Sequence, residues 1–257
     1  MNLLLANDDG VIAPGIRALY LELNEKFNPI IVAPLEERST TGHSLSLDKP
    51  LRLEQLEPNI FGCSGFPADC VLMGLHVLQK SRPDVVISGI NRGANLGQDL
   101  YYSGTIAAAR EAAFHGLPSM AVSLALKNLN GHHFYETAAK IVNMCLEFEL
   151  HLHIPKLALI NINVPNLEFS KIKGFKLTKI GFRRYSEEVH ARIDTRERNY
   201  YWIAGQYLGF NGGQDSDCQA VEDGFVSITP HYLVDNLEEA SKDLSLVIER
   251  LNAKMAP

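Results

Sequence analysis

The sequence predicts an α/β fold, in which helices flank a mostly parallel sheet and a β-rich extension follows toward the C-terminus. Up to Pro165, short apolar runs rich in Val, Ile and Leu alternate with stretches of helical periodicity, which is the pattern of strand-helix-strand units. Polar loops follow several of these runs directly, as they do at the ligand-binding edge of a parallel sheet. From about Ser170, shorter strands broken by charged turns replace the alternation.

The composition is that of a globular protein with a small partner. The 257 residues can bury a sizeable core in one large domain, or in one domain with an appendage, and 46% hydrophobic and 21% charged residues are ordinary values. A net charge of −6 disfavours a broad nucleic-acid or membrane surface. No run of about 18 apolar residues could span a membrane, and no leader-like segment opens the chain, so we expect a cytoplasmic protein.

The first strand-helix-strand unit ends at Pro34. Leu3–Ala6 is predicted to be a short buried strand, Ile16–Phe27 has apolar residues at the spacing of one helical face, and Pro29–Pro34 is a β-branched strand closed by proline. The first strand runs into Asn7-Asp8-Asp9-Gly10, where two adjacent carboxylates repel each other unless a cation or several donors lie nearby. A metal ion at this strand tip is one reading, and a plain Asp/Gly turn is the other.

The loop after the second strand, Leu35 to Ser44, is dense in hydroxyl groups. Its start is expected near the acidic pair, so that Ser39, Thr40 or Thr41 could add an oxygen ligand and Arg38 or His43 could contact an anion. A Ser/Thr-rich turn without a ligand is the alternative. Leu45–Leu53 is predicted to be extended.

A helix is predicted from the apolar spacing of Val71–Leu78, with Pro67 in its first turn. Asp69 lies near the helix start, where a carboxylate interacts favourably with the dipole, and we expect it to be structural. Pro83–Ser88 is predicted to be the next buried strand.

A Gly- and Asn-rich loop, Gly89–Leu100, follows that strand and leads through Ser103, Gly104 and Thr105 into an alanine-rich helix ending near Phe114. A helix start with free N–H groups and two hydroxyls favours a phosphate site, and an ordinary N-cap is the alternative. Glycines four residues apart match neither a dinucleotide fingerprint nor a P-loop.

The remaining elements complete the sheet and the extension. A strand at Pro118–Ser123, a helix at Tyr135–Phe148 and a strand at Leu157–Pro165 are predicted, followed by strands at Lys171–Ile180, Val189–Ile193, Tyr200–Ile203 and Gly224–Thr229, a polar loop at Gly209–Asp217 and a helix at Val234–Leu251. Surface positions are expected for His132, His133, His151 and His153, and buried thiols for Cys63, Cys70, Cys145 and Cys218, which contain no C-x-x-C pair.

Three strand tips thus carry a carboxylate pair, a hydroxyl-rich loop and an amide-rich loop before a helix start. Carboxylate, hydroxyl and amide oxygens suit one hard divalent cation, Mg²⁺ or Mn²⁺, and the helix start suits a phosphate. The pattern favours metal-assisted phosphoryl transfer to water, in which one of Asp8 and Asp9 binds metal and the other accepts a proton.

Several linked motifs, spread over almost the whole chain, resemble the family of stationary-phase survival SurE nucleotidases. They are Asn7-Asp8-Asp9-Gly10, Arg38-Ser39-x-Thr41-Gly42-His43, Pro67-Ala68-Asp69-Cys70, Ser88-Gly89-Ile90-Asn91-x-Gly93-x-Asn95-x-Gly97, Asp99, Tyr102-Ser103-Gly104-Thr105 and Ser227-Ile228-Thr229-Pro230. The resemblance implies a Rossmann-like catalytic core over residues 1–170, a β-rich dimerisation arm over 171–233 and an exchanged C-terminal segment over 234–257, in a homodimer or homotetramer.

The same resemblance implies metal-dependent release of phosphate from nucleoside 5′- and 3′-monophosphates, and in some members from short polyphosphate. It implies metal ligands at Asp8, Asp9, Ser39 and Asn95, and phosphate contacts at Asn91, Ser103, Gly104 and Thr105. Two positions depart from the family pattern, Phe66 where Thr is usual and Glu197 where Gly is usual, which leaves the substrate pocket and the arm geometry open.

Three other functions compete with this one. A haloacid-dehalogenase-like phosphatase needs Asp-x-Asp after its first strand, and here the residues two apart are Asn7 and Asp9. A non-catalytic nucleotide or phosphate sensor would share most of the site residues, so only turnover separates it from an enzyme. A nucleic-acid-binding protein is disfavoured by the acidic charge and the lack of a basic, aromatic-rich strand pair.

Overall fold

The computed structural model describes residues 1–77, 82–126 and 130–234. The helix predicted over Val234–Leu251 and the C-terminal segment 234–257 lie outside these residues, apart from Val234 itself. Leu78, the last residue of the helix predicted over 71–78, also lies outside them. None of the helices in the described ranges is long and apolar enough to cross a membrane.

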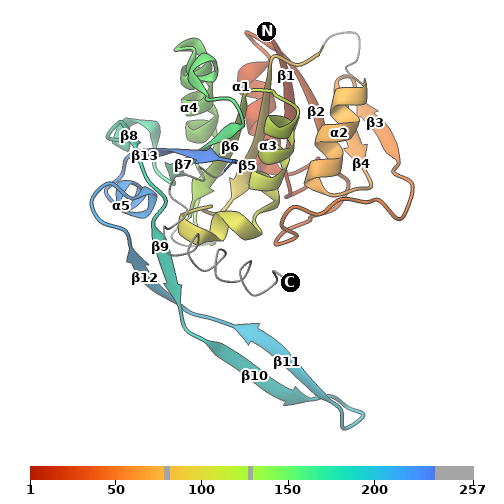
Figure 1. Ribbon diagram of the computed structural model, residues 1–257, viewed down its shortest axis with the longest axis vertical. Helices are drawn as coiled ribbons and strands as arrows, with labels where there is room; N and C mark the ends of the chain where they lie inside the picture. The colour runs from red at the N-terminus through yellow and green to blue at the C-terminus, as the bar shows by residue number, and fades with distance from the viewer. Residues whose placement is uncertain (78–81, 127–129, 235–257) are drawn as a thin grey trace, which may run out of the picture.

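A nine-stranded, mostly parallel sheet forms the centre of the molecule, as predicted (Figure 1). Its strands in spatial order are β3 (Leu53–Glu57), β4 (Ile60–Cys63), β2 (Asn28–Pro34), β1 (Asn2–Ala6), β5 (Val85–Arg92), β6 (Ser119–Ala125), β7 (Ala158–Pro165), β13 (Val226–Tyr232) and β8 (Phe175–Leu177). Neighbouring strands from β4 to β7 are parallel, whereas β3 pairs antiparallel with β4 and β13 antiparallel with β7.

Helices cover both faces of the sheet. They are α1 (Pro14–Leu23), α2 (Pro67–Val77), α3 (Gly104–Phe114) and α4 (Tyr135–Glu147), and short 3₁₀ turns are present at η1 (Gly97–Tyr102), η2 (Leu150–His153) and η3 (Phe169–Lys171). Leu3 and Leu5 of β1 belong to the apolar cluster with α1 and α4, and Leu4 of the same strand belongs to the cluster with α2 and α3. This alternation fixes β1 rigidly, because each fully buried leucine contributes roughly 1.5–3 kcal/mol.

The edge hairpin β3–β4 has no counterpart among the predicted strands. Leu45–Leu53 was predicted to be extended, but it contains no strand before Leu53. The strand β3 begins at Leu53 and ends at Glu57. Most β3 side chains are exposed, so the edge strand carries the charged residues Glu54 and Glu57 rather than an apolar run.

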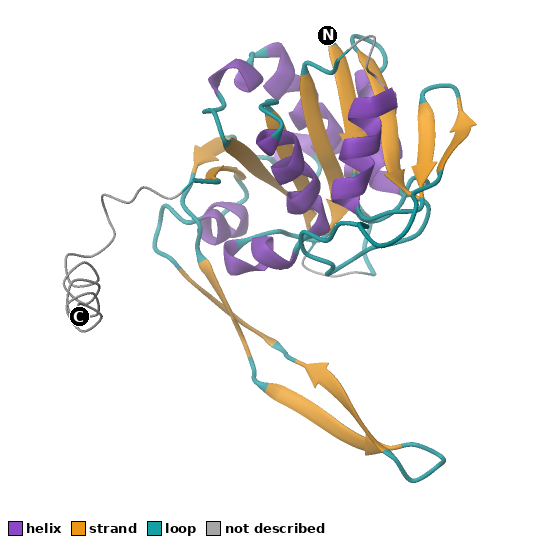
Figure 2. Ribbon diagram, turned by 45° about the vertical axis from the view of Figure 1, so that its right-hand side comes forward, coloured by secondary structure: helices purple, strands orange, loops and turns teal. Residues whose placement is uncertain are grey.

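A long two-stranded arm projects from the body (Figures 1 and 2). β9 (Phe182–Tyr185) pairs antiparallel with β12 (Tyr207–Asn211) at its root, and β10 (Glu188–Ile193) pairs with β11 (Asn199–Ala204) at its tip. The predicted polar loop Gly209–Asp217 overlaps the end of β12 and the first residue of a short helix, α5 (Asp217–Glu222). Within residues 171–233, β8 and β13 pair into the central sheet, and β9 to β12 form the arm.

Candidate functional site

The carboxyl ends of β1, β2 and β5 lie side by side, since β1 pairs in parallel with both neighbours. A cavity of about 550 Å³ opens beyond these ends. It is lined by Asp8, Asp9, Glu37, Ser39, Thr40, Asn91, Arg92, Gly93, Ala94, Asn95, Gln98, Asp99, Tyr102, Ser103 and Tyr185. The cavity therefore gathers all four predicted metal ligands, together with Asn91 and Ser103 from the predicted phosphate site.

The turn after β1 is built by Asn7 and Gly10, not by the acidic pair. The Asn7 side chain donates to the Gly10 carbonyl oxygen at 2.8 Å and accepts from the Gly10 N–H at 3.2 Å. Asp8 and Asp9 are thereby left to present their carboxylates to the cavity. Neither carboxylate forms an ion pair with a Lys or Arg side chain in the described part of the chain, although the positive charge of Arg92 acts to lower the pKa of Asp9.

Asp8 is 4% exposed, and the Thr105 hydroxyl donates to its Oδ1 at 2.5 Å. Burial raises the pKa of Asp8 to about 6, with a smaller contribution from the negative charge of Asp9. Gly104 permits this contact, because a Cβ there would lie 2.7 Å from the Cβ of Asp8. The start of α3 is thus packed directly against the first strand tip.

Asp9 is the more accessible carboxylate. Its Oδ2 accepts a hydrogen bond from the backbone N–H of Arg92 at 2.8 Å, which ties the tips of β1 and β5 together. Burial also raises the pKa of Asp9, although the bond from Arg92 opposes this shift. Burial thus raises the pKa of both carboxylates of the acidic pair.

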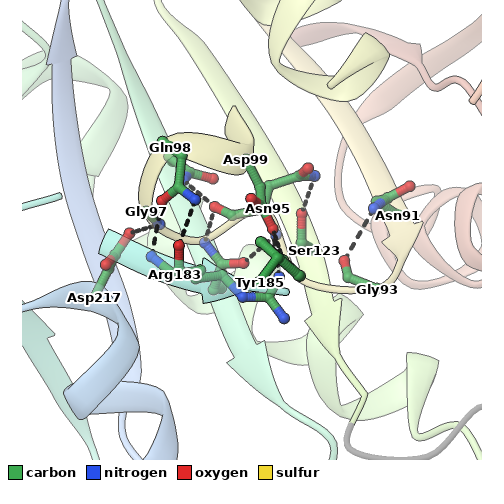
Figure 3. A network of polar contacts seen from close by, with 12 residues as sticks. Asn91, Gly93, Asn95, Gly97, Gln98, Asp99, Ser123, Arg183, Tyr185 and Asp217 are labelled. Atoms are coloured by element: carbon green, nitrogen blue, oxygen red, sulfur yellow. Dashed lines mark hydrogen bonds and ion pairs between the residues drawn. The ribbon is translucent and has the colours of Figure 1, made fainter. Parts of the chain in front are cut away.

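Asn95 is held by residues of β6 and β7 (Figure 3). Its Nδ2 donates to the Ser123 hydroxyl at 2.8 Å. Its main-chain carbonyl oxygen accepts from the Asn161 and Asn163 side chains at 2.7 and 3.1 Å. Because the amide nitrogen is engaged, Oδ1 is the side-chain atom that Asn95 can offer to a cation. Sequence reasoning did not single out Ser123, Asn161 or Asn163, although polar residues at alternate positions of an apolar strand were a usable signal.

Ser39 and Glu37 lie on the β2 side of the cavity. The Ser39 hydroxyl donates to Glu37 Oε1 at 2.6 Å, and Glu37 Oε1 lies 3.9 Å from the Arg92 guanidinium. The four predicted ligands therefore offer two carboxylates, a hydroxyl and an amide oxygen to the cavity, which fits a hard cation such as Mg²⁺ or Mn²⁺. Glu37 is a further lining residue that was not distinguished from its loop neighbours in the sequence.

Three of the four predicted phosphate residues lie at the start of α3, and Asn91 lies on β5. Gly104 and Thr105 do not line the cavity, whereas Ser103 and Asn91 do. Ser103 is the N-cap, its Oγ accepting from the Ile106 N–H at 3.2 Å. The Thr105 hydroxyl is committed to Asp8, so Gly104 and Thr105 offer their backbone N–H groups at the positive end of the helix dipole. Asn91 bonds the Gly93 carbonyl oxygen through its amide nitrogen at 2.9 Å.

Two residues considered for anion contacts do not line the cavity. Arg38 lies over the Phe66 ring at 5.6 Å, and His43 Nε2 lies 2.9 Å from Glu111. Asp69 is structural, as expected, because its carboxylate accepts from the N–H groups of Ser46 and Phe66. The four cysteines are buried thiols, and within the described ranges no group of three or more His, Cys, Asp or Glu side chains is arranged for metal binding.

The chain is similar to known proteins both in sequence and in fold. The family model described as "Survival protein SurE" matches residues 3–187. The chain is 43% identical over 235 residues to the "5′-nucleotidase SurE" of Geobacter metallireducens, covering 91% of this chain and 92% of that protein. It is 39% identical over 257 residues to the protein of the same name from Alkaliphilus metalliredigens, covering 97% and 100%. The crystal structure of the SurE protein from Aquifex aeolicus superposes with a TM-score of 0.85 at 36% identity, covering 96% of this chain and 99% of that one.

Proposed function

The chain belongs to the SurE family, and from this membership and the strand-tip site we propose that it is a 5′-nucleotidase, a phosphoric monoester hydrolase that depends on a divalent metal ion. The observation that carries the proposal is the convergence of Asp8, Asp9, Ser39 and Asn95 on one cavity beside the start of α3. A cation site adjoining an anion site is what metal-assisted hydrolysis of a phosphate monoester needs.

The metal ion would be held by the Asp8 and Asp9 carboxylates, the Ser39 hydroxyl and Asn95 Oδ1. When bound, it supplies Lewis-acid activation of the phosphoryl group and of a water molecule. Thr105 orients Asp8 through its hydroxyl, and the Ser123 hydroxyl of β6 and the Asn161 side chain of β7 fix Asn95. The ligands are thus preorganised by neighbouring elements, which limits the reorganisation that binding requires.

The phosphate would lie against the start of α3. Backbone N–H groups of Gly104 and Thr105, the Ser103 hydroxyl and the Asn91 side chain surround this position, and the helix dipole favours negative charge there. These groups stabilise charge that builds on the phosphoryl oxygens as the ester bond breaks. Asp9, the more exposed carboxylate of the pair, is placed to accept the proton of the attacking water.

The proposal extends to nucleoside 3′-monophosphates and short polyphosphate. The cavity residues assigned to the metal and the phosphate would contact only the phosphate group, which all these substrates share. Since the reacting phosphate is recognised apart from what it is attached to, either sugar position and a phosphate chain present the same group to the site. The resemblance to the family supports the same substrate range.

We further propose that residues 1–170 carry the catalytic core and that the arm within residues 171–233 joins subunits into a homodimer or homotetramer. The arm tip exposes an apolar and aromatic surface that is unusual for an isolated chain. Its members are Val189, Ile193, Tyr200, Tyr201, Trp202 and Ile203, the last being 93% exposed. Sedimentation of the wild type and of Trp202→Ser tests this, and a monomeric wild type would contradict it.

Phosphate release from a panel of nucleoside 5′- and 3′-monophosphates tests the activity. We expect turnover with Mg²⁺ or Mn²⁺, none after chelation, and none in Asp9→Asn under either condition. Asp84→Asn is the matched control, because Asp84 lies just before β5, at the amino ends of the strands and away from the cavity. Its carboxylate accepts a hydrogen bond from the Asn2 N–H there. Nucleotide binding without turnover under any metal would support a sensor and contradict the proposal.

A further inference from the structure

Part of the cavity is not accounted for by the metal and phosphate residues. Glu37, Arg92, Gly93 and Ala94 line the cavity beside the metal and phosphate residues, and the rest of its wall is formed by Thr40, Gln98, Asp99, Tyr102 and Tyr185. If the phosphate occupies the position proposed for it, the nucleoside lies beside this wall. The cavity volume of about 550 Å³ falls within the range of about 300–1,000 Å³ that is usual for small-molecule sites.

Tyr185 is the one of these five residues that comes from the arm, and its ring is held in place (Figure 3). Its hydroxyl donates to Asp99 Oδ2, which also accepts from Arg183 Nη1 at 2.6 Å. The guanidinium carbon of Arg183 lies 5.4 Å from the centre of the Tyr185 ring and 4.6 Å from that of Tyr207. A ring fixed in this way loses little conformational freedom when a ligand packs against it.

The root of the arm is tied to the segment that follows Asn95. The Gln98 side chain accepts from the Arg183 N–H at 2.8 Å and donates to the Arg183 carbonyl oxygen at 2.6 Å, as a neighbouring strand would. The buried Asp217 carboxylate accepts from the N–H groups of Gly97 and Gly181 at 2.9 and 2.8 Å. These bonds fix the position of the Tyr185 ring relative to the metal and phosphate residues.

We infer that Tyr185 is the specificity-determining residue of the site, with its ring packed against the nucleoside of the substrate and Asp99 as the residue that positions the ring. This inference rests on the proposed nucleotidase function and adds the part of the substrate that the phosphate residues do not recognise. Every base has a π face, so an aromatic wall accepts different bases. It favours nucleotides over small phosphate esters that have no ring to stack.

Tyr102 is the competing aromatic residue of this wall. Its side chain is 67% exposed, compared with 40% for Tyr185, and it projects from η1 rather than from the arm. The bond to Asp99 and the packing of Arg183 favour Tyr185, because a preorganised ring contributes more to affinity than a solvated one. Tyr102→Ala therefore belongs in the test as a direct rival.

The test is calorimetric titration of the Mn²⁺-loaded full chain with two probes, adenosine and inorganic phosphate. Tyr185→Ala is expected to weaken adenosine binding about 10- to 100-fold, the range for loss of a base-stacking ring, and to leave phosphate binding unchanged. Tyr185→Phe keeps the ring but loses the bond to Asp99, so an intermediate loss is expected. Tyr232→Phe is the matched control, since it removes a hydroxyl from an exposed residue of β13 outside the cavity, and adenosine affinity should not change.

Several results would overturn the inference. They are unchanged adenosine affinity in Tyr185→Ala, a loss confined to Tyr102→Ala, equal losses for adenosine and phosphate, or no adenosine binding by the wild type. Turnover is measured separately on the same samples. A wild type that binds adenosine through Tyr185 but releases no phosphate from nucleotides would refute the nucleotidase function while leaving the role of Tyr185 intact.

Discussion

Asp8→Asn should make the metal-free protein more stable, although it removes a carboxylate that we propose to be catalytic. Asp8 is 4% exposed, and its pKa rises from 3.8 to about 6 on folding. The folded state therefore binds more protons than the unfolded state between these values, and the stability of the wild type falls as pH rises through this interval. Two pKa units correspond to about 3 kcal/mol.

Asparagine cannot ionise and still offers an oxygen to the Thr105 hydroxyl. The variant should gain up to about 3 kcal/mol over the wild type above pH 6 and nothing near pH 4. Urea denaturation in chelator at a series of pH values measures this difference. Added Mn²⁺ should stabilise the wild type alone and so reduce the gap.

A different outcome would refute the reasoning. If Asp8→Asn were less stable than the wild type at pH 7.5 in chelator, the carboxylate would be part of the structure of the turn. The turn bonds of Asn7 and Gly10 do not involve Asp8, so the structure gives no reason for that loss.

Four further predictions concern stability and metal binding. Asp217→Asn should destabilise the protein by about 2 kcal/mol in urea denaturation. The buried Asp217 carboxylate accepts from the N–H groups of Gly97, Gly181 and Cys218, and in the variant the asparagine NH₂ group would face one of these N–H donors; an unchanged midpoint would contradict this. Mn²⁺ affinity, measured by calorimetry, should fall about tenfold per unit as pH drops below about 6, since a proton competes for Asp8. Thr105→Val should move this fall to higher pH by removing a bond that lowers the pKa of Asp8, and identical profiles would exclude a role for the hydroxyl. Glu197→Gly should raise the thermal midpoint, with a gain of up to about 1 kcal/mol, because Glu197 has a φ of 60° in the arm-tip turn; a lower midpoint would show that the side chain stabilises the turn.

Much of the core was predictable because the periodicity of a parallel α/β sheet is local. Leu3–Ala6, Pro29–Pro34 and Pro83–Ser88 were each identified from a few consecutive residues, and the geometry of parallel strands then places their ends together. The same rule predicted that the acidic pair, the hydroxyl-rich loop and the amide-rich loop lie close together, whereas the full set of metal and phosphate residues came from the resemblance to the family. The hairpin β3–β4 was not predicted, since its exposed edge strand lacks a clear apolar alternation.

The supports of the site could not be predicted in the same way. The contacts of Asn95 with Asn161 and Asn163, and of Asp99 with Arg183 and Tyr185, join residues far apart in the chain. Such pairs depend on how β7 and the arm pack, which one-dimensional patterns do not encode. Glu197 shows the converse case, because its departure from the family pattern was visible in the sequence, whereas its left-handed conformation required the structure.

The central claim is that one divalent cation binds between the tips of β1, β2 and β5. Anomalous diffraction from crystals grown with Mn²⁺ tests this most directly. The account predicts a single strong peak within coordination distance of Asp8, Asp9, Ser39 and Asn95, and no peak there in Asp9→Asn crystals. The claim would be contradicted if wild-type crystals showed no Mn²⁺ peak in the strand-tip cavity while protein dissolved from the same crystals still released phosphate with Mn²⁺.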